Sequence, residues 1–323
     1  MNSVKLIATD ANPIFAENIS KNLRIPLTMR NIKYHANTEI KVQIEENVRG
    51  FSVYIISTGS TYNNKSVNDH LMEVLCMVDA CKRSDVKSIC LIIPCFPYAR
   101  SDKKDDGRCC IGASLVTNLL INAGVTRIVA VDLHAGQIQG FCNIPFDNLY
   151  AINIFSDYLI WYMNNEKNFI LISPDNGGAK RVNCYAQRLK MPYVIMNKQR
   201  DYTTEGKVEK TQLISTINIE GKIGIIIDDM IDTCGTMIFS CNELKSHNLR
   251  EIIIISTHGV FSGNAIDKIN ECEFIKEVIV TNTLPQEENL KKCSKLTVLE
   301  ISPLISNVIN RLETNGSISE LFK

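Results

Sequence analysis

The strongest chemical signal in the chain is a pair of acidic residues followed by a short turn of small and hydroxyl-bearing residues. Residues 223–227 are almost all isoleucine, Asp228 and Asp229 follow, and the turn contains Asp232, Thr233, Cys234, Gly235 and Thr236. Successive backbone N–H groups in such a turn, helped by the positive end of a following helix, form a cradle for a phosphate group. The two acids repel phosphate, so they suit sugar hydroxyls or a divalent cation. On these residues alone, a solvated strand end followed by a helix cap is an equally good interpretation.

A basic cluster and an acid–histidine pair are the next candidates. Residues 100–104 contain one Arg and two Lys after a Pro-bounded turn, and such side chains can neutralise a polyphosphate. Asp132 and His134 follow another apolar run, and side chains two residues apart in an extended backbone point to one side. Oxygen ligands at such a position suit Mg²⁺. An ordinary solvated loop and a structural histidine are the alternatives.

A polar stretch without apolar periodicity begins at Asn197 and lasts to about Gln212. It is too long for a simple connector, and long polar loops in compact domains often act as mobile lids. We therefore expect a loop here that closes over a bound ligand. An exposed linker with routine charges is the alternative.

Short β-branched runs alternate with longer segments of helical periodicity, a pattern that predicts an α/β fold. The strand candidates are residues 53–57, 89–93, 128–131, 169–172, 223–227, 252–255 and 278–280. Because these runs are nearly continuous Ile and Val, both faces of each sheet should be covered by helices, as in a mainly parallel sheet. Such sheets bind ligands beyond the carboxyl ends of their strands, which is where the polar residues described above would lie.

The chain contains two similar helix–strand segments, one beginning at Gly112 and one at Gly235. Arg127 and Arg250, which precede the strands of the two segments, are equally distant from these glycines. This indicates a degenerate internal duplication whose halves meet near residues 149–153. We therefore predict domains 1–149 and 150–323, with the last residues a candidate to pack back on the N-terminal domain.

The composition favours a small-molecule enzyme over several other classes of protein. The 323 residues include 35 Lys plus Arg and 35 Asp plus Glu, so no global field attracts nucleic acid or an anionic membrane. Twelve cysteines are scattered through the chain without a C-x-x-C pair, which is typical of reduced core thiols. No run reaches the roughly 18 apolar residues of a membrane span. We expect a cytoplasmic protein with neither a nucleic-acid nor a membrane partner.

Several motifs, in the same order along the chain, resemble those of the ribose-phosphate pyrophosphokinase family. The run 228–236 is similar to the phosphoribosyl pyrophosphate loop of type I phosphoribosyltransferases, and the other motifs are residues 94–104, 132–135, 137–141, 173–175, 177–181 and 281–283. The likeness extends from about Leu6 to Phe322. It implies two tandem phosphoribosyltransferase type I-like domains. It also implies a magnesium-dependent enzyme that transfers the diphosphoryl group of ATP to the 1-hydroxyl of ribose 5-phosphate and releases AMP.

The resemblance also implies roles for individual residues. Ribose 5-phosphate would be bound in the C-terminal domain by Asp228, Asp229, Asp232, Thr233, Cys234, Gly235 and Thr236. ATP would be bound in the N-terminal domain by Asn37, Glu39, Arg100, Ser101, Asp102, Lys103 and Lys104. The catalytic residues would be Lys198, Arg200 and His134. The metal positions would be Asp132, His134, Asp175, Asn143 and Asp147.

The resemblance further implies a homo-oligomer, commonly a hexamer in which a loop of one subunit completes its neighbour's ATP site. Activation by inorganic phosphate and inhibition by ADP are expected, with Arg49 and residues 315–317 in regions that resemble the regulatory site. The chain departs from the family's usual pattern at His35, Ser101 and Asn143.

Two other functions remain open. One is a non-catalytic regulatory subunit, which would be expected to have a damaged phosphate loop. The other is a phosphoribosyltransferase, which does not account for the basic cluster in the N-terminal half.

Overall fold

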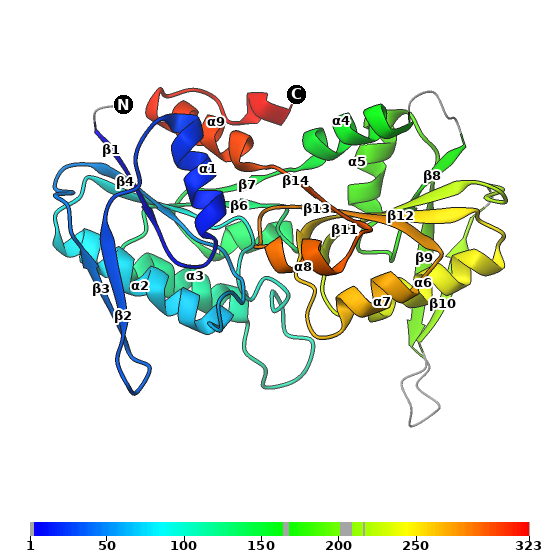
Figure 1. Ribbon diagram of the computed structural model, residues 1–323, viewed down its shortest axis with the longest axis horizontal. Helices are drawn as coiled ribbons and strands as arrows, with labels where there is room; N and C mark the ends of the chain where they lie inside the picture. Colours follow the sequence, from blue (N-terminus) through cyan, green and yellow to red (C-terminus); the bar gives the residue numbers. More distant parts are fainter. Residues whose placement is uncertain (1–2, 164–167, 201–208, 216, 323) are drawn as a thin grey trace. The chain divides into compact units, whose positions relative to one another are not determined.

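The computed structural model describes residues 3–163, 168–200, 209–215 and 217–322, which form two compact units. Unit 1 consists of Met1–Tyr150, Asn282–Pro285 and Glu300–Lys323, and unit 2 consists of Ala151–Thr281 and Gln286–Leu299 (Figure 1). The chain therefore returns to unit 1 for its last helix. None of the helices in these described ranges has the length and apolarity that crossing a membrane requires.

Unit 1 is built on a parallel sheet with the strand order β1-β4-β5-β6-β7. These strands are β1 (Val4–Ala8), β4 (Ser52–Ile56), β5 (Ser88–Ile92), β6 (Arg127–Val131) and β7 (Phe146–Leu149). Helices α2 (Val67–Arg83) and α3 (Gly112–Ala123) cover one face, and α1 (Pro13–Leu23) and α9 (Ser302–Glu313) cover the other (Figure 1). Two short 3₁₀ helices, η1 (Gly136–Phe141) and η2 (Ser319–Phe322), complete this unit.

An antiparallel hairpin of β2 (Arg30–Tyr34) and β3 (Ile40–Ile44) forms a separate two-stranded sheet in unit 1. It packs against α2 rather than joining the main sheet. The sequence analysis did not predict these two strands. Their residues are half-buried or exposed, and polar residues interrupt the apolar ones, so they lack the continuous apolar run that marks a fully buried strand.

Unit 2 has a larger sheet with the order β10-β9-β8-β11-β12-β13-β14, in which only the β9–β10 pair is antiparallel. Its strands are β8 (Phe169–Ser173), β9 (Tyr193–Arg200), β10 (Glu209–Ile214), β11 (Ile223–Ile231), β12 (Glu251–Gly259), β13 (Ile275–Thr281) and β14 (Leu296–Leu299). Helices α4 (Ile152–Met163) and α5 (Ala179–Leu189) lie on one face. The other face carries α6 (Gly235–Ser246), α7 (Ala265–Glu271) and α8 (Glu287–Lys292).

The predicted α/β class and all seven predicted strands are confirmed. Residues of β4, β5, β8 and β11 are buried along almost their whole length, because helices cover both sheet faces. The two similar segments also have the same local structure. In each, a helix begins at the glycine, Gly112 or Gly235, and the next strand begins at or directly after the arginine.

The prediction of an irregular polar loop from Asn197 to Gln212 is wrong at both ends. Strand β9 extends through Arg200, β10 begins at Glu209, and the two strands pair antiparallel. Their pairing satisfies the backbone hydrogen bonds of a segment whose side chains show no apolar alternation, so periodicity could not reveal it. Residues 201–208, where the tip of the expected lid falls, lie outside the described residues.

A buried carboxylate fastens the hairpin to the rest of unit 1. Glu73 of α2 is completely buried and accepts hydrogen bonds from Tyr34 Oη at 2.6 Å, Lys65 Nζ at 3.0 Å and the backbone N–H of Asp10 at 3.1 Å. His70 Nδ1 lies 3.2 Å from it. Burial raises the pKa of Glu73, but these partners outweigh burial and lower the pKa to about 2. The cluster thus joins the end of β1, the strand β2 and the helix α2.

We predict that Glu73→Gln destabilises the protein by about 3 kcal/mol at pH 7, because it leaves buried donors without a carboxylate partner. The folded-state pKa lies below the unfolded value of 4.5, so this stabilisation is complete above pH 4.5 and is lost as pH falls towards 2. Urea unfolding followed by circular dichroism should therefore show the two proteins converging between pH 5 and about 2.5. The exposed Glu288→Gln serves as the control and should leave stability unchanged. A constant difference across this pH range would contradict the prediction.

Candidate active site

The phosphate-binding turn predicted from the sequence lies at the carboxyl end of β11 and leads directly into α6. Cys234, the N-cap residue of α6, adopts a left-handed backbone conformation with φ +60°, and its own side chain does not cap the helix. A methyl group built on Gly235 would meet only Thr233 Oγ1, at 3.9 Å, so the space beside this glycine is open. Backbone N–H groups at the positive end of a helix, beside open space, are suited to bind a phosphate group.

Helix α7 supports this turn from the side. Lys268 Nζ donates a hydrogen bond to the carbonyl oxygen of Thr233 at 2.9 Å. The bond fixes the backbone of the turn and places a positive charge close to the space that a phosphate would occupy.

The two acids are placed differently from the prediction, which put them after the end of the strand. Strand β11 continues to Ile231, so Asp228 and Asp229 lie within it. Asp229 is only 4% exposed, whereas Asp228 keeps 27% of its side chain exposed. Burial and the neighbouring carboxylate of Asp229 raise the pKa of Asp228 well above its usual range. A ligand that donates hydrogen bonds or positive charge would relieve this repulsion.

Arg181 of α5 is a residue of this site that the sequence analysis did not assign. Its guanidinium Nη1 lies 3.0 Å from Asp229 Oδ1 and 3.3 Å from Asp228 Oδ1. One cation therefore contacts both acids and positions them. Arg181 is the last residue of the motif 177–181 that supported the family resemblance, and this was the available signal.

Three more predicted residues lie at the same edge of the sheet in unit 2. Asp175 follows β8, the neighbour of β11, and its Oδ1 accepts a hydrogen bond from the backbone N–H of Gly178 at 2.8 Å. Lys198 and Arg200 are the last part of β9, the strand on the other side of β8. Because β8, β9 and β11 run parallel, their carboxyl ends meet at one edge, where the sequence analysis expected a site.

The basic cluster in unit 1 follows β5 and is tied to the residues that follow β6. Asp102 is buried and accepts a hydrogen bond from Gln137 Nε2 at 2.7 Å. Ser101 Oγ accepts the backbone N–H of Gly112 at 3.0 Å and so holds the start of α3. Arg100, Lys103 and Lys104 are exposed. The cluster therefore combines structural residues with basic side chains that face solvent.

The expected geometry of Asp132 and His134 is wrong. We predicted an extended backbone with both side chains on one side, but β6 ends at Val131 and Asp132 has φ +42°. Asp132 is 8% exposed, and His134 is exposed. His258, the counterpart of His134 in the second segment, is buried within β12, which is typical of a structural histidine.

Asp147 lies apart from the other predicted metal positions. It is near the start of β7 and forms an ion pair with Arg127, the first residue of β6. Both residues are therefore towards the amino ends of their strands, whereas Asp132 and His134 follow the carboxyl end of β6. Asn143 precedes β7 and is exposed. The structure does not gather Asn143 and Asp147 with the acid–histidine pair.

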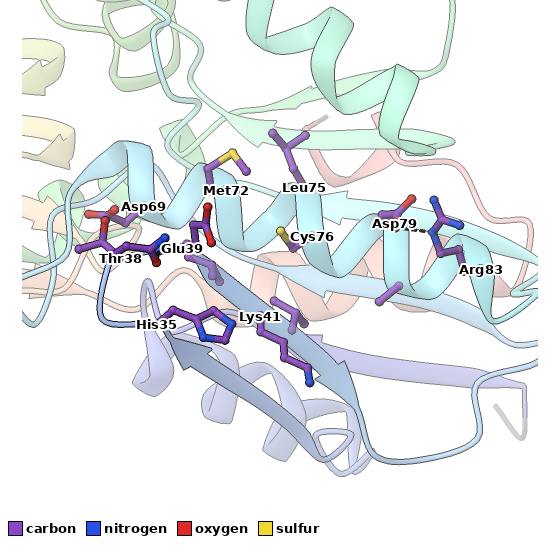
Figure 2. A pocket seen from close by; sticks show the side chains of 14 residues that line it. His35, Thr38, Glu39, Lys41, Asp69, Met72, Leu75, Cys76, Asp79 and Arg83 are labelled. Carbon is purple, nitrogen blue, oxygen red and sulfur yellow. Dashed lines mark hydrogen bonds and ion pairs between the residues drawn. The ribbon is translucent and has the colours of Figure 1, made fainter.

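Asn37 and Glu39 lie at the tip of the β2–β3 hairpin, where both side chains are exposed. They help to line an open groove of about 980 Å³ between the hairpin and α2, and Figure 2 shows Glu39 and His35 on the hairpin below this helix. The basic cluster and His134 are not among the described residues that line the groove. The predicted ATP-binding residues therefore form two separate sets within unit 1.

The residues near the carboxyl ends of the parallel strands, in each of the two main sheets, are chemically suited to bind a magnesium ion. The described residues contain no group of three His, Cys, Asp or Glu side chains able to hold a metal. Mg²⁺ does not need such a group, because it commonly binds one or two carboxylates together with waters and phosphate oxygens. Asp175 and Asp228 in unit 2 and Asp132 in unit 1 offer such carboxylates.

Comparisons with known proteins agree with the motifs. A family model described as the N-terminal domain of ribose phosphate pyrophosphokinase matches residues 4–124, and a model of the phosphoribosyl synthetase-associated domain matches residues 204–323. The chain is 42% identical over 321 residues to ribose-phosphate pyrophosphokinase 2 of Saccharomyces cerevisiae. It is 40% identical over 322 residues to the protein of that name in Schizosaccharomyces pombe. Each alignment covers 99% of this chain and 98% of the relative.

A solved structure supports the same relationship over the whole fold. The chain is similar to phosphoribosylpyrophosphate synthetase from Mycobacterium smegmatis, with a TM-score of 0.89 and 37% sequence identity. The superposition covers 97% of this chain and 100% of that chain. The resemblance found in the sequence is thus confirmed, and the chain belongs to the ribose-phosphate pyrophosphokinase family.

Proposed function

We propose that the protein makes phosphoribosyl pyrophosphate from ATP and ribose 5-phosphate. The 1-hydroxyl oxygen of the sugar attacks the β-phosphorus of ATP in line with the bond to the α-phosphate. A new O–P bond forms, the bond between the α- and β-phosphates breaks, the hydroxyl proton leaves and AMP is released. Reactions of this kind depend mainly on alignment and on stabilisation of charge at the phosphate oxygens.

The observation that carries this proposal is that the start of α6, with open space beside Gly235, directly follows the paired acids of β11. The turn of Asp232, Thr233, Cys234, Gly235 and Thr236 would bind the 5-phosphate through backbone N–H groups and hydroxyls. Asp228 and Asp229, held by Arg181, would accept hydrogen bonds from the ribose hydroxyls. The acids and the turn are only a few residues apart, as the two ends of one small sugar phosphate require.

We assign ATP binding to unit 1. The exposed side chains of Arg100, Lys103 and Lys104 suit the triphosphate, and Asp102 and Ser101 hold their loop in place. Asn37 and Glu39 would contact the base or the ribose of ATP. Because they lie in a separate groove, we propose that they complete the ATP site of a neighbouring subunit in a homo-oligomer, commonly a hexamer in this family.

Lys198, Arg200 and His134 are the residues that we propose to act on the reacting phosphates. When bound, Mg²⁺ would supply positive charge to the phosphate oxygens. Asp132 and Asp175 are the carboxylates that we propose would bind Mg²⁺.

Two further proposals rest on the family: inorganic phosphate activates the enzyme, and Arg49 and residues 315–317 take part in its regulation. A cytosolic location is supported by the cysteines, all twelve of which are free thiols.

An assay of AMP release from Mg-ATP and ribose 5-phosphate tests the proposal against its two rivals. We expect AMP and phosphoribosyl pyrophosphate in equal amounts, with faster turnover when inorganic phosphate is added. A regulatory subunit would release no AMP. A phosphoribosyltransferase would instead consume phosphoribosyl pyrophosphate when a purine or pyrimidine base is supplied.

We predict that Gly235→Ala raises the KM for ribose 5-phosphate about 10-fold or more, because its methyl group enters the open space where the 5-phosphate binds. The fold should not suffer, since that methyl group meets no protein atom closer than 3.9 Å. Steady-state kinetics and thermal unfolding of the same preparation test both statements. Asn242→Ala, at an exposed position of the same helix, should change neither quantity. An unchanged KM in the Gly235 variant would exclude the turn as the phosphate site.

We predict that Lys198→Ala lowers kcat about 100-fold or more and changes the KM values much less, because its charge acts mainly in the transition state. The measurement is a full kinetic analysis with both substrates varied. Lys245→Ala removes the same charge from the exposed end of α6 and should leave kcat near that of the wild type. Near-normal turnover in the Lys198 variant would refute its proposed role.

A further inference from the structure

The tip of the β2–β3 hairpin carries Asn37 and Glu39, the two residues of this hairpin that we assign to ATP. The last register pair of the hairpin joins Tyr34 to Ile40, and a backbone hydrogen bond of 2.8 Å between the first and last residues of 35–39 closes the turn. The side chains of all five turn residues are exposed. The position of such a turn therefore depends on how firmly the strand residues next to it are held.

Tyr34 holds the strand at the residue next to this tip. Its hydroxyl donates a hydrogen bond to Oε1 of Glu73 at 2.6 Å, and Glu73 is completely buried in α2. Burial and the carboxylate of Glu73 raise the pKa of Tyr34, so the phenol stays protonated and donates. The ammonium group of Lys65 lies over the Tyr34 ring, 4.4 Å from its centroid. Both contacts involve charged groups and are stronger than contacts between neutral groups.

A second anchor holds the first residue of β2. Arg30 Nε donates to the carbonyl oxygen of Ala8 at 2.9 Å, and its Nη2 forms an ion pair with Asp10. Arg30 and Tyr34 are four residues apart in a strand, so their side chains leave it on the same face. Ile32, between them on that face, packs against the apolar core of unit 1. The strand is thus fixed at both ends from one side.

Lys65 joins the two anchors into one network. Its Nζ lies 2.8 Å from Asp10 Oδ2 and 3.0 Å from Glu73 Oε1. The contacts form one continuous series along five residues: Arg30, Asp10, Lys65, Glu73 and Tyr34. Two cations face two carboxylates, so the charges of the series balance. Because the side chain of Lys65 is only 19% exposed and Glu73 is buried, water screens these contacts less than it screens a surface ion pair.

We propose that Tyr34 is a positioning residue for ATP, which holds the hairpin tip where Asn37 and Glu39 contact the nucleotide. Tyr34 lies three residues before the first of them and five before the second, and its hydroxyl is bonded to the body of unit 1 rather than directed to a ligand. The effect on ATP rests on the proposed function of the hairpin, whereas the fixing of the tip does not.

Removal of the Tyr34 hydroxyl would release the hairpin at one point only. Glu73 would keep Lys65 Nζ and the backbone N–H of Asp10 as donors, so its charge would stay compensated. The anchor at Arg30 would remain as well. The hairpin would stay against α2 but would move most at its tip, which is farthest from the remaining anchor. A displaced tip weakens contacts to the base or ribose of ATP and leaves the reacting phosphates aligned.

The main test compares Tyr34→Phe with the wild type in steady-state kinetics. We expect the KM for ATP to rise about 10-fold, as the loss of one hydrogen bond to a charged group would cause. Both kcat and the KM for ribose 5-phosphate should change less than about 2-fold, because uniform binding of one substrate is lost. Amide hydrogen exchange followed by mass spectrometry should be faster in residues 35–39 of the variant. Size-exclusion chromatography should show an unchanged assembly.

Tyr54→Phe is the matched control. Tyr54 of β4 also donates its hydroxyl to a glutamate of unit 1, Glu313 Oε1 of α9, at 2.7 Å. This variant should lose a similar amount of stability in thermal unfolding and keep the KM for ATP of the wild type. If Tyr34 had only a structural role, the two variants would have the same kinetics.

A double-mutant cycle shows whether Tyr34 acts through the tip. A variant with Asn37→Ala and Glu39→Ala should have a raised KM for ATP. Adding Tyr34→Phe to it should change that KM less than about 2-fold, because the contacts that Tyr34 positions are already absent.

Four results would overturn the proposal: an unchanged KM for ATP in Tyr34→Phe, an equal rise in Tyr54→Phe, a full 10-fold effect in the variant without the tip residues, or a changed assembly. Failure of the proposed function is distinguishable, because the variant with both tip residues replaced would then keep the KM of the wild type. In that case the role in ATP binding is overturned too, and hydrogen exchange alone decides whether Tyr34 fixes the tip.

Discussion

The start of α6, which is the positive end of the helix dipole, lies a few residues from the two carboxylates of β11. These opposite charges determine which ligands suit the candidate site in unit 2. A bare phosphate is attracted by the helix end and repelled by the acids, whereas a phosphorylated sugar can satisfy both at once. Arg181 contacts both acids and reduces their mutual repulsion, although burial and the carboxylate of Asp229 still raise the pKa of Asp228. We therefore propose that one short segment of sequence lets the site discriminate between a sugar phosphate and free phosphate.

The fold provides the rigidity that such a segment needs. The buried parallel strands β8 and β11 fix where the acids and the turn begin, and α7 fixes the turn from the side through Lys268. In unit 1, the buried cluster around Glu73 and the hydrogen bond between Asp102 and Gln137 hold polar loops in place in the same way. The turn at residues 232–236, the β2–β3 hairpin and the basic loop are therefore each joined to the rest of their unit by at least one specific hydrogen bond.

The fold class and the central strands could be predicted from the sequence because a strand that is covered on both faces of its sheet needs a continuous run of apolar residues. Few other structures require such runs of Ile and Val. The prediction failed at β2, β3, β9 and β10, since polar residues interrupt or end the apolar runs of these strands. The turn between β11 and α6 could be predicted because its residue types and local backbone decide it, and its role in binding phosphate stays a prediction. Arg181 was missed because its role depends on a contact between α5 and β11, which only the three-dimensional fold brings together. The geometry of Asp132 was missed because this residue has a left-handed backbone conformation. Such a conformation in a residue other than glycine cannot be identified from the sequence.

The most direct test of this account is a crystal structure of the protein with ribose 5-phosphate. The account predicts that the 5-phosphate accepts hydrogen bonds from backbone N–H groups between Thr233 and Thr236, and that the ribose hydroxyls donate to Asp228 and Asp229. It would be contradicted by a sugar phosphate bound away from the start of α6, or by one whose phosphate lies against other groups while this turn holds only solvent.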